Sequence, residues 1–174
     1  VCQAQPITLM KNSCDTLIDY CNDVEADDKL GLVIYSHTNS DGAIKEAGLT
    51  STLSTVKTLY RQRQAGHYTG GTNIYAGMHL ARLELENNGR HQAFKMIILM
   101  TDGLPNLPSN NPSGLVIQEA NACLASKIKV MTISLGANAD TSLLQQVADI
   151  TGGIHFTVPG GATYRSEERR VGKE

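Results

Sequence analysis

The segment Phe94-Lys-Met-Ile-Ile-Leu-Met-Thr-Asp-Gly-Leu-Pro-Asn106 joins an unbroken apolar run to a Thr-Asp-Gly turn. Such a run, without polar alternation, is typical of a strand in a parallel sheet that is covered on both faces. In open sheets of this type, ligands bind outside the carboxyl ends of the strands. The segment therefore predicts a buried strand over 96–100 and places Asp102 where a site is expected.

Strand-like and helix-like patterns alternate along the rest of the chain. Further strands are expected at 30–35, near 47–50, at 130–135 and at 154–158. Helices are expected at about 6–22, 53–60, 74–88, 114–124 and 141–150, with Asn73 or Thr72, Ser113 and Asp140 as N-terminal caps. This order predicts an α/β fold with a doubly wound, mostly parallel sheet and helices on both faces.

Composition limits the class of partner. The chain has 174 residues, of which 41% are apolar and 18% charged, with a net charge of -2. This length suits one domain, and the absence of a basic surplus argues against nucleic-acid binding. No stretch of the sequence reaches the roughly 18 apolar residues that a membrane span needs, so we expect no direct membrane insertion by this segment.

Both ends of this layout depart from a complete domain of the predicted type. The pattern begins with a helix that no strand precedes, and no helix follows the last expected strand. Seven of the ten residues at 165–174 are charged, and this decapeptide resembles the translation of a common sequencing adapter. We therefore expect a partial domain over 1–164, without its first strand and last helix, and a non-native tail over 165–174.

Oxygen-bearing side chains are expected at one edge of the sheet. Asp102 follows Thr101 at the end of a strand, and Thr72 lies in a glycine-bounded loop before a helix. A carboxylate with hydroxyl oxygens suits Mg²⁺, Mn²⁺ or Ca²⁺ better than zinc or copper. Gly70 and Gly71 would let the backbone bend so that the Thr72 hydroxyl turns inward. Asp-Gly turns and Thr-Asn caps are also common structural features, so each motif alone decides little.

Taken together, two segments resemble a known metal site. Thr69-Gly-Gly-Thr-Asn-Ile74 and Ile97-Ile-Leu-Met-Thr-Asp-Gly-Leu-Pro-Asn106 are similar to the second and third segments of the metal-ion-dependent adhesion site of von Willebrand factor A domains. The order of elements matches that family to about Val158. The amino-acid sequence around these segments, with Ala65-Gly-His-Tyr before the first, is closest to that of the A domains of bacterial tight-adherence (Flp) pilus-assembly proteins.

The resemblance implies that Thr72 coordinates a metal ion directly and that Asp102 holds it, often through water. The family's first motif, Asp-x-Ser-x-Ser, is absent from this sequence. We therefore expect Mg²⁺, or Mn²⁺ or Ca²⁺, to bind only when that segment is restored. The residues expected to support the site are Thr69, Gly70, Gly71, Asn73, Thr101 and Gly103.

The resemblance also implies a function. It indicates a non-enzymatic, metal-dependent protein-binding or adhesion module whose protein ligand offers an acidic side chain to the metal. It further implies a bacterial surface or pilus-assembly protein, extracytoplasmic, with an anchor outside this sequence. The alternative is a doubly wound hydrolase or transferase that uses Asp102 catalytically. The sequence contains no GxSxG nucleophile elbow and neither GxGxxG nor GxxxxGK, which favours the binding module.

Overall fold

The structure is a computed structural model that describes residues 6–24, 27–36, 42–64 and 70–158. Within these ranges the helices and strands follow one another in the order that the sequence pattern predicts. The elements are α1 (Pro6–Asp23), β1 (Leu30–Tyr35), β2 (Ala43–Thr50), α2 (Leu53–Arg61), α3 (Ile74–Asn88), β3 (Lys95–Thr101), α4 (Pro112–Ala125), β4 (Ile128–Leu135), α5 (Thr141–Thr151) and β5 (His155–Val158). The predicted tail at 165–174 lies outside the described residues.

The strands form two sheets. β1 and β2 pair antiparallel, with a register that ends at Tyr35 opposite Ala43. β3, β4 and β5 pair parallel in that order. Thr101 lies opposite Ser134, so β3 and β4 end at the same edge. Parallel strands linked by helices confirm the predicted α/β class.

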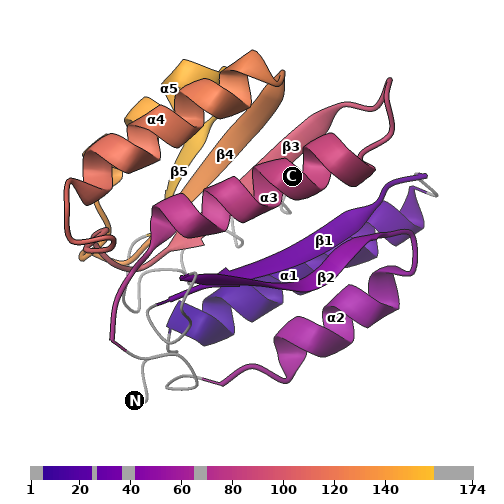
Figure 1. Cartoon of the computed structure of the whole chain (residues 1–174). Coiled ribbons are helices and arrows are strands. Elements are labelled where there is room, and N and C mark those ends of the chain that lie inside the picture. The colour runs from indigo at the N-terminus through magenta and orange to yellow at the C-terminus, as the bar shows by residue number, and fades with distance from the viewer. Residues whose placement is uncertain (1–5, 25–26, 37–41, 65–69, 159–174) are drawn as a thin grey trace, which may run out of the picture.

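Helices lie on both sides of the strands. Figure 1 shows α1 and α2 below the β1–β2 pair, and α3, α4 and α5 above. The helix α3 packs against β1, β2 and β3, and thus spans both sheets. None of the helices in the described ranges combines the length and apolar character of a membrane-spanning helix.

The helix caps agree with the sequence pattern at two places and differ at one. The Asn73 side chain accepts a hydrogen bond from Ala76 N at the start of α3, and Asp140 caps α5 in the same way. The predicted cap Ser113 is wrong, because α4 begins at Pro112, two residues before the predicted start. Its cap is Asn111, whose side chain accepts from Gly114 N at 3.2 Å. Pro112 then takes the first helical position, where a missing N–H costs nothing.

The expectation that the strand at 96–100 is buried on both faces is wrong for the described residues. In β3, Ile97 and Leu99 are buried beneath helices, whereas Met96 on the opposite face is 37% exposed. In β1, no residue is fully buried. The physical reason is that the main helix contacts of β3 and β4 come from α3, α4 and α5, which cover one face only.

Candidate functional site

Two loops meet at the carboxyl edge of β3. The first contains Gly70 to Asn73 and leads directly into α3, and the second contains Asp102 to Leu107 and follows β3. Thr72 N donates to Asn106 Oδ1 at 2.7 Å. The Thr72 carbonyl in turn accepts from Asn106 N at 3.1 Å and from Leu107 N at 3.3 Å. Three hydrogen bonds thus hold the backbone of one residue, Thr72, against the loop that carries Asp102.

The Thr72 hydroxyl points toward the Asp102 turn. A methyl group added at Gly103 would lie 3.2 Å from Thr72 Oγ1, with no other neighbour within 4 Å. The hydroxyl therefore lies against the residue that directly follows Asp102. The structure brings Thr72 and the Asp102 turn together, as the sequence analysis expected for one edge of the sheet.

Glycine is required at two positions of the Thr72 loop for different reasons. Gly70 has a φ of 112°, which side chains of L-residues rarely adopt. At Gly71 a Cβ atom would lie 2.4 Å from Leu107 Cδ1 and 3.0 Å from Asn106 Oδ1. The close approach of the two loops therefore depends on Gly71, and the bend before it depends on Gly70.

The remaining predicted residues differ in their placement. Thr101 is buried at the end of β3, and its hydroxyl lies 3.4 Å from the backbone of Gly103. Asp102 is exposed to solvent. Asn73 caps α3 and so supports the loop from behind. Thr69 lies outside the described residues.

Asp102 and Thr72 fit part of a metal shell. Their oxygens are the hard donors that Mg²⁺, Mn²⁺ and Ca²⁺ prefer, and the exposed carboxylate is accessible to an ion from solvent. Within the described ranges, no three His, Cys, Asp or Glu side chains gather in a way that could hold a metal ion. A complete shell needs about six donors, of which these two residues could offer two.

Tyr35 adds a contact that the sequence analysis did not anticipate. Its hydroxyl donates to the Met100 carbonyl at 2.5 Å, across from β1 to β3. Burial raises the pKa of Tyr35 to about 12; a hydrogen bond with Thr101 works against this rise, and the negative charge of Asp102 adds to it. The hydroxyl therefore stays protonated and serves as a donor beside the Asp102 turn.

Two supporting residues escaped the sequence analysis. Asn106 stood within the quoted Asp-Gly-Leu-Pro-Asn segment, but its amide was not assigned a role. Tyr35 was assigned only to a strand. The signal that could have found both residues is a polar side chain at the carboxyl end of a predicted strand, or just beyond it. Parallel strands bring these ends to one edge of the sheet, where the site is expected.

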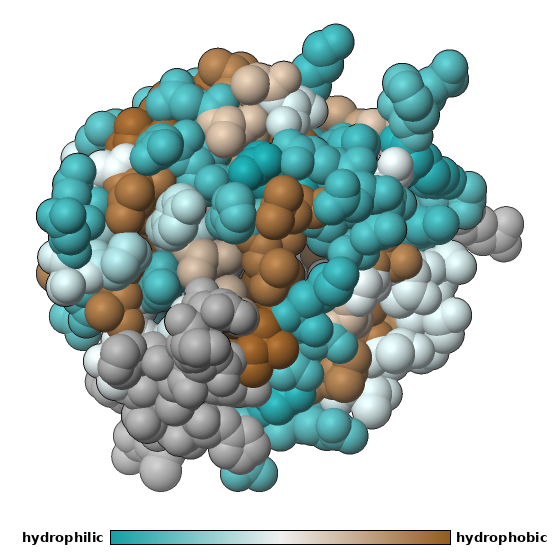
Figure 2. All heavy atoms as spheres, viewed as in Figure 1, coloured by the Kyte–Doolittle hydropathy of each residue, from teal (hydrophilic) through white to brown (hydrophobic). Residues whose placement is uncertain are grey.

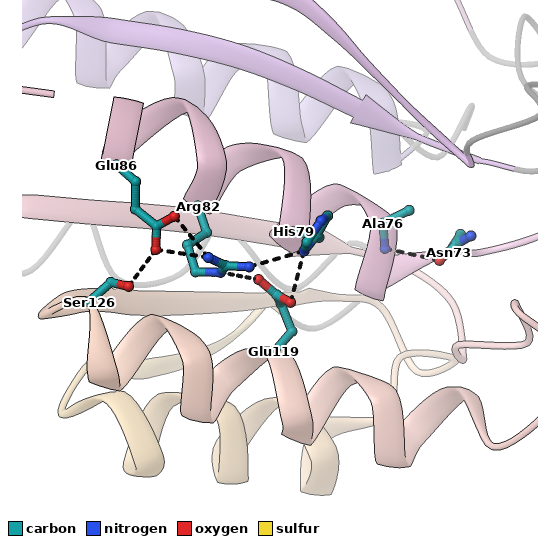
Figure 3. A network of polar contacts seen from close by, with 7 residues as sticks. All are labelled: Asn73, Ala76, His79, Arg82, Glu86, Glu119 and Ser126. Carbon is teal, nitrogen blue, oxygen red and sulfur yellow. Dashed lines mark hydrogen bonds and ion pairs between the residues drawn. The ribbon is translucent and has the colours of Figure 1, made fainter. Parts of the chain in front are cut away.

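His79 on α3 belongs to a different group of polar residues, which joins α3 to α4 (Figure 3). Its Nδ1 lies 3.1 Å from Glu119 Oε2 and 3.1 Å from an Arg82 nitrogen. Arg82 Nε also donates to Glu119 Oε1 at 2.5 Å, and this hydrogen bond raises the pKa of Arg82. His79 therefore takes part in a contact between helices, which gives no support to a catalytic role with Asp102.

Comparison with known proteins identifies relatives of this fold. A family model described as the von Willebrand factor type A domain matches residues 2–165. A solved structure of an aerotolerance-related membrane protein from Bacteroides fragilis, with multiple mutations to serines, is similar with a TM-score of 0.72. It is 19% identical over 89% of this chain and 83% of that chain.

Two further solved structures are similar. Proximal thread matrix protein 1 from the mussel byssus, with a zinc-occupied MIDAS motif, has a TM-score of 0.65 and 22% identity over 86% of this chain and 36% of that chain. The SpRpn10 VWA domain has a TM-score of 0.64 and 15% identity over 86% of this chain and 75% of that chain. A search of curated proteins found no match. At these identities the structural likeness concerns the fold alone.

Proposed function

This chain belongs to the von Willebrand factor type A domain family, and on that basis we propose that it binds a protein ligand through a divalent cation at the Thr72–Asp102 edge. The family consists of protein-interaction and adhesion modules, generally without enzymatic activity. The ion would be held by the Thr72 hydroxyl directly and by the Asp102 carboxylate, often through water. An acidic side chain of the protein ligand would complete its shell.

The observation that carries this proposal is the backbone clamp on Thr72. Three hydrogen bonds from the loop after β3 fix Thr72, and its hydroxyl lies against Gly103. A hydroxyl held against the residue that follows an exposed carboxylate is suited to binding a hard cation. The zinc-occupied MIDAS motif of the mussel protein supports a divalent ion at this kind of site. For this chain we favour Mg²⁺, with Mn²⁺ or Ca²⁺ as substitutes, because both donors are oxygens.

Full affinity would require more donors than these two residues supply. We propose that they come from a segment with the pattern Asp-x-Ser-x-Ser, which would bring a second carboxylate and two hydroxyls to the same edge. Without it, Thr72 and Asp102 would hold the ion weakly. Because few negatively charged protein groups would surround the ion, it would stay electrophilic. It would then attract a carboxylate from outside the chain.

We place this activity at the surface of a bacterium, in adhesion or pilus assembly. The support is the amino-acid sequence of the two metal-site segments, which resembles that of the A domains of tight-adherence pilus-assembly proteins. The structural likeness to a membrane protein of Bacteroides fragilis is compatible with a location outside the cytoplasm.

The test uses a longer chain in which a strand ending in Asp-x-Ser-x-Ser precedes residue 1. Its unfolding temperature is measured in Mg²⁺ and in EDTA. Ion at 100 times its dissociation constant stabilises a fold by about 2.7 kcal/mol, or about 5–10 °C for a chain of this size. Asp102→Ala should abolish that shift, and the matched control Asp149→Ala, an exposed acid on α5, should retain it. Equal midpoints in Mg²⁺ and EDTA for the unmutated longer chain would refute the metal site.

A further inference from the structure

Asparagine or aspartate is followed by glycine at three places in this chain, namely Asp41–Gly42, Asn88–Gly89 and Asp102–Gly103. Such pairs form a cyclic imide when the glycine nitrogen attacks the side-chain carbon of the residue before it, and glycine has no Cβ to hinder this attack. Water then opens the ring to aspartate or to isoaspartate, in which the main chain runs through the side chain. Asp41 lies outside the described residues, so the structure describes only the other two pairs completely.

Hydrogen bonds hold Asn88–Gly89 against ring closure. In a free peptide this pair is the more reactive one, because a side-chain amide loses ammonia more readily than a carboxylate loses water. In the folded chain, Asn88 Nδ2 donates to Glu84 Oε2 at 2.9 Å. Gly89 N donates to the Leu85 carbonyl at 3.1 Å. Ring closure therefore has to break two hydrogen bonds in the last turn of α3.

This protection does not come from burial. Asn88 is exposed, and Figure 2 shows hydrophilic side chains over the end of α3 and the loop that follows it. Water therefore reaches the pair. The protection comes from the helix, which directs Gly89 N back toward Leu85 and so away from the side chain of Asn88.

Asp102–Gly103 lacks both restraints. Asp102 is exposed, and among the described residues its carboxylate has no hydrogen-bond or ion-pair partner. Within the same ranges Gly103 N donates only to the Thr101 hydroxyl, at 3.4 Å, which is beyond the roughly 3.2 Å limit of an ordinary bond. The pair follows β3 and belongs to neither a helix nor a strand. Its nitrogen and its carboxyl group are therefore both available for reaction.

The surroundings of Gly103 also leave room for the ring. Apart from its chain neighbours, a Cβ added at Gly103 would meet only Thr72 Oγ1, at 3.2 Å. At Gly89 the same atom would lie 2.3 Å from the Leu85 carbonyl oxygen and 3.0 Å from Lys95 Cε. Ring closure at Gly103 therefore displaces fewer neighbouring atoms than ring closure at Gly89.

We propose that Asp102 isomerises to isoaspartate in the folded chain while Asn88 is spared, which reverses their order in a free peptide. The Gly103 nitrogen bonds to the side-chain carboxyl carbon of Asp102, and the protonated carboxyl group loses its hydroxyl with the amide hydrogen as one water molecule. One water molecule then adds to the ring. Cleavage of the bond from the main-chain carbonyl carbon to nitrogen gives isoaspartate, and cleavage of the other carbon–nitrogen bond restores aspartate.

Isomerisation changes the loop at the carboxyl edge of β3. The main chain gains the side-chain methylene, and the carboxylate is left directly on Cα. The loop is fixed before the pair by the buried Thr101 and after it by Asn106, which is bonded to Thr72. The added backbone atom has to be absorbed between these two points, and the carboxylate arm becomes shorter. That this ends cation binding rests on the proposed function, whereas the isomerisation itself does not.

The test incubates the whole chain at neutral pH and physiological temperature for several weeks, folded in buffer and unfolded in guanidinium chloride. Peptide mapping by mass spectrometry, with enzymatic methylation of isoaspartate, quantifies the reaction at both pairs. In guanidinium chloride Asn88 should react first. Folding should slow Asn88 about 10–100-fold, the equivalent of two ordinary hydrogen bonds, and should slow Asp102 less than about tenfold. Isoaspartate at 102 should therefore exceed modification of Asn88 in the folded chain.

Two substitutions test the geometry of the pair. Asp102→Asn supplies an amide in place of the carboxylate, so the ring should close faster in the folded chain and yield both aspartate and isoaspartate at 102. Gly103→Ala places a methyl group beside Thr72 Oγ1 without requiring a positive φ. It should lower isoaspartate formation at 102 and leave the reaction of Asn88 unchanged. Circular dichroism verifies that each variant is folded during the incubation.

Three results would overturn the proposal. One is isoaspartate at 102 in guanidinium chloride but none in the folded chain. Another is that Asn88 reacts ahead of Asp102 in the folded chain. A third is that folded Asp102→Asn forms no isoaspartate, since the backbone would then exclude the ring.

The isomerisation and the proposed metal function fail separately. The longer chain that carries Asp-x-Ser-x-Ser is aged in the same way, and its unfolding temperature is measured in Mg²⁺ and in EDTA. Isoaspartate at 102 that leaves the Mg²⁺ effect unchanged would support the isomerisation and count against Asp102 as a metal ligand. A Mg²⁺ effect that declines in proportion to the isoaspartate content would support both.

Discussion

Replacement of Glu119 tests whether a buried ion pair fixes α3, the helix that follows the Thr72 loop, against α4. The side chains of Glu119 and Arg82 are 4% and 14% exposed. Removing one partner of a buried pair typically costs about 3–5 kcal/mol, because the other charge stays buried without compensation. Arg82 keeps bonds of 2.8 and 2.9 Å to Glu86. Glu119→Leu should therefore cost about 3 kcal/mol of unfolding free energy, the lower end of that range.

A double-mutant cycle measures the coupling between the two charges. A loss of 3 kcal/mol corresponds to a fall in the unfolding temperature of about 6–12 °C for a chain of this length. Arg82→Met combined with Glu119→Leu removes both charges, and the pair should then be within about 1 kcal/mol of the natural chain. The coupling energy from urea unfolding is the summed cost of the two single replacements minus the cost of the double one, and it should be at least about 2 kcal/mol.

Salt and a surface variant serve as controls. A buried pair is screened much less than an exposed one, so the coupling should persist in 1 M NaCl, where the Debye length is about 3 Å. Glu86→Ala removes a partly exposed partner and should cost about 0.5 kcal/mol. Additive costs of the two single replacements, or a coupling that vanishes in salt, would refute the interpretation of a buried pair.

Three further predictions concern the surroundings of the site. Burial pushes the pKa of Glu84 up, but bonds from Lys45 and neighbouring donors outweigh it and leave the pKa lowered. Glu84 therefore stabilises the fold at pH values above its ordinary pKa of 4.5, and this stability is lost as the pH falls through the lowered pKa of the folded state. In urea unfolding between pH 7 and pH 3, Glu84→Gln should lose less unfolding free energy than the natural chain. Asn73→Ala removes the cap of α3 and should cost about 1 kcal/mol in the same assay; no change would mean that the cap does not hold the helix. Gly77→Ala places a methyl group 2.6 Å from the Tyr35 ring and should cost about 1–3 kcal/mol, whereas the double replacement with Tyr35→Ala should relieve that overlap.

The sequence predicted the local structure well where one pattern dominated. The strand formed by the apolar run before Asp102 and the cap at Asp140 both depend on neighbours in sequence, and the structure has each of them. Family membership was predictable for a related reason, since Thr72 and Asp102 stand on the right elements in the right order. The metal itself stays a prediction.

Features that depend on distant residues were not predictable. The apolar run of β1 indicates a buried strand, but its burial depends on what packs beside it, and it is only half-buried. The role of Asn106 could not be predicted, because its side-chain amide accepts a hydrogen bond from the backbone of Thr72, which lies 34 residues away in the sequence. The cap of α4 was misassigned because Ser113 and Asn111 are both good capping residues, and Pro112 decides between them only once its position is known.

The clamp on Thr72 has a consequence for the energetics of recognition. Ordering a flexible residue on binding costs about 1–2 kcal/mol of conformational entropy, which is subtracted from affinity. Thr72 is already fixed by Asn106 and Leu107 before any ion or ligand arrives. The Thr72 loop is therefore preorganised. The conformational entropy lost on binding would come mainly from the groups that complete the shell of the proposed ion. Affinity should then respond more to stiffening the incoming partner than to stiffening this loop.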